Sequence, residues 1–92
     1  MQISLDKFRA KLVVKILYAR SPEHADRFIN AAITAMKRKK VNGYIITRFI
    51  DKVHDQLSKQ SMIVKDGMQR SNMLAARCTL LNTKKLMNLE LA

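Results

Sequence analysis

The scarcity of turn-forming residues is the feature of this sequence that most restricts its fold. Its 92 residues include only two glycines and one proline. β-sandwiches and β-barrels need many tight turns, and those turns draw on glycine and proline. So small a supply suits a few helices joined by short connections. We therefore expect an all-α protein, folded as a small antiparallel bundle of about four helices.

Apolar residues recur at intervals of three and four along most of the chain, which is the period of a helix with one buried face. The helices expected from this spacing cover approximately residues 5–20, 22–40, 44–59 and 66–89. Short connections between successive helices pair them into two helical hairpins, near 1–41 and 42–92. A chain of this length forms one domain, so we expect a single helical domain over 1–92.

Residues that commonly cap helices support these bounds. Ser21 followed by Pro22 is the clearest helix start, because serine caps the first turn and proline suits the first helical position. Asn42–Gly43 is expected to stop the second helix and turn the chain, and Thr47 is an alternative, later start for the third. Asp66 is expected to cap the last helix, which we predict to run without a break.

The inner face of the last helix is harder to assign, because apolar residues lie on several of its sides. The positions expected to face the core are Met68, Leu74 or Ala75, Cys78, Leu81, and Leu86 or Leu89. Cys78 is the sole cysteine, so no disulfide can form within the chain, and we expect a buried, inert thiol. One thiol and two distant histidines make no metal site, and we expect no cofactor.

Charge is the most unusual part of the composition. Eighteen lysines and arginines against seven acids give a formal net charge of +11. Residues 1–41 contain ten basic and three acidic residues, and residues 42–92 contain eight and four. The excess is therefore spread over the folded surface and not confined to a tail. A surface of this kind attracts polyanions, so nucleic acid or another polyanion is the expected partner.

Three groups of basic residues are the candidates for contact with phosphates. They are the run Lys37, Arg38, Lys39 and Lys40, the row Lys7, Lys11 and Lys15, and the row Arg70, Arg77 and Lys84 with Lys85 beside it. Each group also has a simpler explanation. The run ends a helix, where cations are stabilised by the helix dipole, and either row can be a solvated helix face.

A protein–protein interaction module is the alternative function. The second half of the chain is rich in methionine and leucine, and methionine-rich surfaces adapt to partners. The residues expected at this interface are Met68, Leu86, Met87, Leu89 and Leu91. Through them the last helix could bind a partner protein or pair with a second copy to give a homodimer.

Catalysis finds little support in the sequence. Asp51, His54 and Asp55 come nearest to a catalytic group, but the basic residues around them, Arg48, Lys52 and Lys59, explain the acids as surface ion pairs. We therefore expect no enzyme and no small-molecule substrate. No signal peptide or membrane-spanning run is visible, so a membrane is not an expected partner. The expected compartment is the cytoplasm, and the expected function is that of a small, basic binding protein or a subunit of a complex that handles nucleic acid.

Overall fold

Helices account for nearly all of the part of the chain that the computed structural model describes, residues 5–59 and 66–91. They are α1 (Leu5–Leu17), α2 (Pro22–Arg38), α3 (Gly43–Ser58) and α4 (Gly67–Leu91), and these described residues contain no strand. The prediction of an all-α bundle of about four helices is confirmed. Three of the helices end earlier than expected, and α4 runs unbroken past Asn82.

Side-chain caps mark the starts of α2 and α4. Ser21 has an extended backbone, as expected of a residue that precedes a proline, and its hydroxyl oxygen accepts a hydrogen bond from the backbone N–H of His24 at 3.1 Å. α1 ends at Leu17 instead of continuing to residue 20, and residues 18–21 connect it to α2. Asp66 caps α4 in the same way, accepting from the N–H of Gln69 at 2.7 Å.

The connection between α2 and α3 differs from the expected Asn42–Gly43 stop. The left-handed residue that ends α2 is Lys40, with a φ of 59°. The backbone N–H of Lys40 donates to the Lys37 carbonyl and that of Val41 to the Met36 carbonyl, both at 3.0 Å, which is the Schellman pattern. Asn42 instead caps α3, accepting from the N–H of Tyr44 at 2.7 Å. The later start at Thr47 is therefore wrong.

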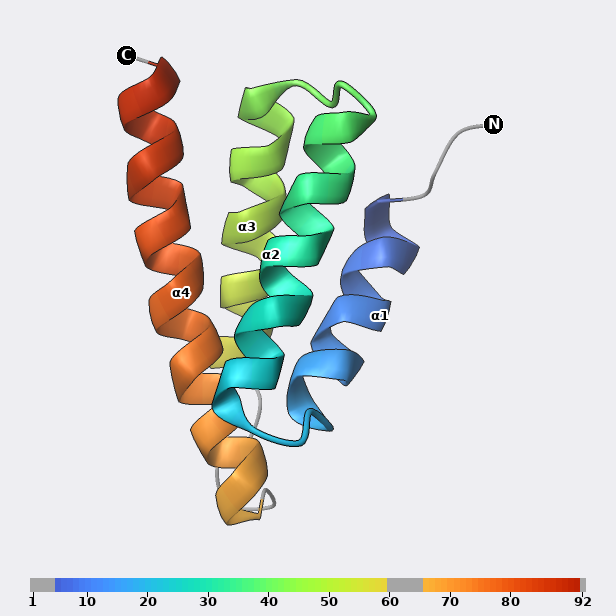
Figure 1. Cartoon of the computed structure of the whole chain (residues 1–92), viewed down its shortest axis with the longest axis vertical. Coiled ribbons are helices and arrows are strands. Elements are labelled where there is room, and N and C mark those ends of the chain that lie inside the picture. Colours follow the sequence, from blue (N-terminus) through green and yellow to red (C-terminus); the bar gives the residue numbers. More distant parts are fainter. Residues whose placement is uncertain (1–4, 60–65, 92) are drawn as a thin grey trace.

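Successive helices run in opposite directions, so α1 and α3 begin at the end of the bundle where α2 and α4 finish (Figure 1). Both α2 and α3 pack against α1 and against α4. One apolar core lies among the four helices. It contains Leu12, Val13, Ile16, Leu17, Ala19, Ala25, Ile29, Ala32, Ile33, Met36, Ile46, Phe49, Ile50, Val53, Leu57, Met73, Ala76, Leu80 and Met87.

The face that α4 presents to the core was predicted wrongly. Its buried residues are Asn72, Met73, Ala76, Leu80 and Met87, none of which belongs to the expected set. The expected residues Met68, Leu74, Cys78, Leu81, Leu86 and Leu89 are exposed, and Ala75 is half-buried. Asn72 is fully buried and donates from its side-chain amide to the Ala19 carbonyl at 2.8 Å. This bond fixes α4 against the end of α1, so the helix is oriented partly by a polar contact that an apolar pattern cannot reveal.

Candidate anion-binding site

The predicted run of basic residues at the end of α2 lies on the surface. Lys37, Arg38, Lys39 and Lys40 are all exposed. They surround the connection from α2 to α3, at the end of the bundle where α1 and α3 begin (Figure 1). The run therefore presents four cations to solvent, and the left-handed Lys40 belongs to it.

The predicted row on α1 is also exposed, and two of its members border a groove. Lys11 and Lys15 line a groove of about 190 Å³ between α1 and α2, whose other walls include Phe28 and Ala31. The Lys15 ammonium lies 5.7 Å from the centre of the Phe28 ring, which is within cation–π range. Lys7 is exposed on the same helix. This row therefore belongs to the α1–α2 side of the bundle.

The predicted row on α4 is divided among different surroundings. Lys84 forms an ion pair with Asp51 of α3, with 2.6 Å between its ammonium and the carboxylate. Arg77 is half-buried, whereas Arg70 and Lys85 are exposed. The Lys84–Asp51 pair places this row on the α3–α4 side, which shares no helix with the α1–α2 groove. The structure therefore does not unite the three predicted groups on one surface.

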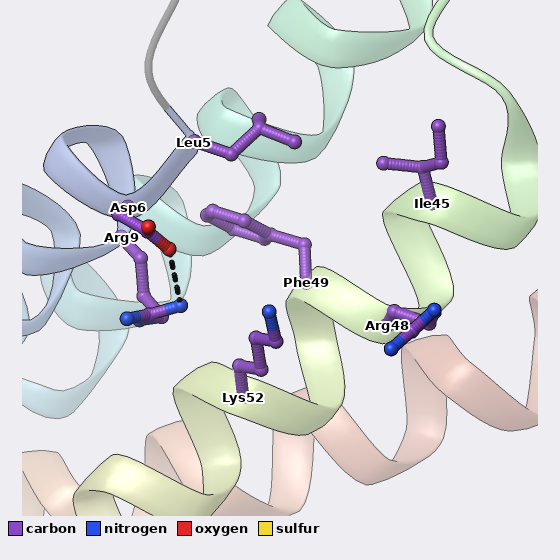
Figure 2. A pocket seen from close by; sticks show the side chains of 7 residues that line it. All are labelled: Leu5, Asp6, Arg9, Ile45, Arg48, Phe49 and Lys52. Carbon is purple, nitrogen blue, oxygen red and sulfur yellow. Dashed lines mark hydrogen bonds and ion pairs between the residues drawn. The ribbon is translucent and has the colours of Figure 1, made fainter.

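A pocket between α1 and α3 gathers three cations that the sequence analysis did not propose as ligand contacts. This seam pocket has a volume of about 240 Å³ and is lined by Leu5, Asp6, Arg9, Ile45, Arg48, Phe49 and Lys52. Figure 2 shows the apolar side chains of Leu5, Ile45 and Phe49 along one side and the three cationic side chains along the other. The pocket thus combines an apolar wall with a cationic one.

Neighbouring side chains hold Arg9 in place within the seam pocket. Its guanidinium forms an ion pair with Asp6 at 3.1 Å, and its Nε donates to the Gln56 side-chain oxygen at 3.3 Å. Phe49, which lies behind the pocket, stacks on Phe8 with 5.6 Å between the ring centres. The core therefore supports the apolar wall, and two polar contacts orient one of the three cations.

Arg48 and Lys52 are the cations of the seam pocket that have no carboxylate partner. The sequence analysis assigned both of them to the acids of α3 as surface ion pairs. The structure instead pairs Asp51 with Lys84 of α4, and Asp55 with Lys59 at 3.5 Å. Arg48 and Lys52 consequently form no ion pair or hydrogen bond with the described residues.

The remaining acids of the described chain are largely engaged as well. Asp6 holds Arg9, and Asp66 caps α4. Asp26 accepts a hydrogen bond from the Thr79 hydroxyl at 2.6 Å, which joins α2 to α4. Asp26 and Asp51 thus join different helices, whereas Asp6, Asp55 and Asp66 act locally, and much of the cationic surface is left unbalanced.

Two predictions for α4 need correction, one for the interface and one for the buried thiol. Met87 is only 4% exposed and belongs to the core, so it cannot form part of an interface. Cys78, expected to be buried, is exposed on the side of α4 that faces away from the core. Met68, Leu86 and Leu89 are exposed as an interface requires, and the side chain of Leu91 lies outside the described part of the structure.

Over residues 5–59 and 66–91, no group of three or more histidine, cysteine or acidic side chains is placed to hold a metal ion. His54 is half-buried, and its Nε2 has no hydrogen-bond partner among these residues. None of the helices within the same residues has the length and hydropathy needed to cross a membrane. The chain matches no family model, no curated protein and no solved structure, so its function has to be argued from its own residues.

Proposed function

We propose that this protein is a non-enzymatic binding protein for nucleic acid, which it holds by the phosphate backbone. The observation that carries the proposal is the pair Arg48 and Lys52, which lie at one pocket without any carboxylate partner among the described residues. Cations left unpaired in a folded protein attract phosphate without first having to break an ion pair. Arg48 can also bind a phosphate through two parallel N–H bonds.

The surroundings of the seam pocket support a polyanion as the ligand. Leu5 and Ile45, which line the pocket, lie at the starts of α1 and α3, toward the end of the bundle that carries Lys37–Lys40. Both cationic groups lie toward the same end of the bundle, and the proposal is that one nucleic-acid strand contacts both. The apolar wall of the pocket suits the less polar sugar that lies between phosphates. Binding of this type releases counterions and reads little of the base sequence.

The proposal is tested by removing two charges at the pocket and, as a control, two charges elsewhere. The Arg48→Ala/Lys52→Ala variant should raise the Kd for a fluorescein-labelled oligonucleotide by about tenfold, because two phosphate contacts are lost. The control variant Arg20→Ala/Arg27→Ala removes two exposed cations, one in the connection from α1 to α2 and one in the first half of α2, and should change the Kd by less than about threefold. Fluorescence anisotropy at constant ionic strength measures both values.

Equal losses of affinity in the two variants would mean that the oligonucleotide is attracted by the overall charge alone. The seam pocket would then make no specific contribution to binding. Wild-type protein that failed to bind at low salt would contradict the proposed function itself. The lining residues Arg48 and Lys52 are exposed, so both should be replaceable without loss of the fold. Thermal unfolding of each variant checks this expectation.

A further inference from the structure

The side of α4 that faces away from the core carries a largely apolar stripe, which is interrupted by Lys85. This outer stripe consists of Leu74, Cys78, Leu81, Lys85 and Leu89, at successive spacings of four, three, four and four residues. At 3.6 residues per turn these positions fall within an arc of about 80°. All five are exposed, and Leu74 and Leu89 are 50% and 73% exposed. In Figure 1, no other helix covers this side of α4.

The spacing of the outer stripe is that of a helix that pairs with another helix. From Leu74 to Lys85 the spacing follows a heptad repeat, in which Leu74 and Leu81 take d positions and Cys78 and Lys85 take a positions. One turn further on, Leu89 falls at an e position, next to Asn88 at d. Three exposed leucines on one helix face favour burial against a partner, because removing an apolar side chain from water is favourable. A second amphipathic helix can bind such a face by packing along it.

The charges beside the outer stripe indicate what kind of helix fits it. Arg70, Arg77 and Lys84 occupy the g positions that flank the stripe, and no acid occurs between Gly67 and Leu89. Arg77 is half-buried, and it forms no hydrogen bond or ion pair with the described residues. Residues at g positions choose partners by charge. Lys84 already pairs with Asp51 of α3, so carboxylates on a facing helix would meet chiefly Arg70 and Lys85, which are exposed.

A second copy of this chain fits the outer stripe poorly. An antiparallel pair would set the basic g positions Arg70, Arg77 and Lys84 against the same row of the other copy. A parallel pair would place Lys85 directly against its counterpart at an a position. Both arrangements bring like charges together on molecules that each carry +11. The charges therefore favour an acidic partner over a homodimer.

We propose that the outer stripe is a docking site for an amphipathic helix of another protein, one with leucine-like residues on one face and carboxylates along its edges. The leucines of that helix cover Leu74, Leu81 and Leu89. Its carboxylates contact Lys85 and the exposed Arg70. The docking surface lies on α4 and contains none of the residues of the seam pocket, so it is independent of nucleic-acid binding.

Cys78 gives a direct test, because it is the sole thiol of the chain and lies at the centre of the stripe. Two designed peptides of three heptads serve as probes. Both have leucine at the a and d positions, and one has glutamate and the other lysine at the e and g positions. The glutamate peptide should slow alkylation of Cys78 by iodoacetamide at least tenfold at saturation. The lysine peptide should leave the rate unchanged at the same concentration.

Two variants with the same change in charge locate the contact. Leu74→Asp/Leu81→Asp should weaken binding of the glutamate peptide at least tenfold in anisotropy measurements, because two carboxylates replace apolar contacts. Val14→Asp/Tyr18→Asp introduces the same charges at exposed positions near the end of α1, and it should change the Kd less than about threefold.

Equal protection of Cys78 by both peptides would overturn the proposal, as would equal effects of the two double variants. A concentration-dependent dimer in light scattering that Leu74→Asp/Leu81→Asp dissolves would show that a second copy occupies the stripe, and so would also overturn it. The alkylation experiment uses the unaltered chain, so its result stands even if a variant fails to fold.

Discussion

Lys40 has two roles: its backbone takes the left-handed conformation that ends α2, and its side chain belongs to the proposed anion-binding surface. Its φ of 59° lies in the left-handed region, where glycine is strongly favoured at the end of a helix. A side chain in this conformation costs roughly 1–2 kcal/mol. The chain places a lysine here at that cost, within its run of four exposed cations. Compared with glycine, lysine at this position therefore adds a positive charge at the expense of some folding stability.

Lys40→Gly should consequently move stability and binding in opposite directions. Glycine relieves the left-handed strain, although it also gives the unfolded chain more freedom, so a net gain in the free energy of unfolding of about 0.5–1 kcal/mol is expected. The lost cation should weaken oligonucleotide binding several-fold. Urea denaturation and anisotropy measure the two effects. A loss of stability would show that the Lys40 side chain makes contacts that its exposure does not suggest.

Single residues also mark where sequence reasoning succeeds and where it stops. Ser21 and Asp66 were correctly predicted as caps, because a cap depends on neighbours within one turn. Arg48 and Lys52 were misjudged, because the acid expected to balance them, Asp51, binds Lys84 from another helix. Which cation an acid selects depends on tertiary packing, and no local spacing encodes it.

Helix α4 illustrates the same contrast at the scale of an element. Its bounds and continuity were predicted correctly, but its buried face was not. In α1, α2 and α3 one apolar face stands out, and that face is buried. α4 has two apolar faces, one with Met73, Leu80 and Met87 and one with the leucines of the outer stripe. The apolar pattern of the sequence therefore does not determine which of the two faces packs against the core.

Adjacent leucines provide a matched test of the face that α4 buries. Leu80 is 1% exposed and Leu81 is 51% exposed. Leu80→Ala should lower the free energy of unfolding by about 2–5 kcal/mol, because it leaves a cavity in the core. Leu81→Ala should lower it by less than about 1 kcal/mol. Urea denaturation compares the two variants. A larger loss of unfolding free energy for Leu81→Ala would mean that α4 buries the face that carries Leu81 instead of the face that carries Leu80.

At the scale of the whole molecule, the charge of +11 acquires a structural explanation. Most of the described acids are engaged by other groups: Asp26 and Asp51 join different helices, and Asp6, Asp55 and Asp66 act within or at the start of one helix. The cations around them are left to face solvent. Composition alone indicated a polyanionic partner. The site that we propose for it consists of the seam pocket and the nearby end of α2.

The salt dependence of oligonucleotide binding tests this account most directly. Phosphate contacts release counterions, so a plot of log K against log salt concentration should be linear, with a slope of about −0.7 to −0.9 for each phosphate neutralised. We expect steep loss of affinity between low and moderate salt for the wild-type protein, and a slope shallower by about two for Arg48→Ala/Lys52→Ala. An affinity that does not change with salt, or a slope that the double variant leaves unaltered, would contradict phosphate binding at the seam pocket.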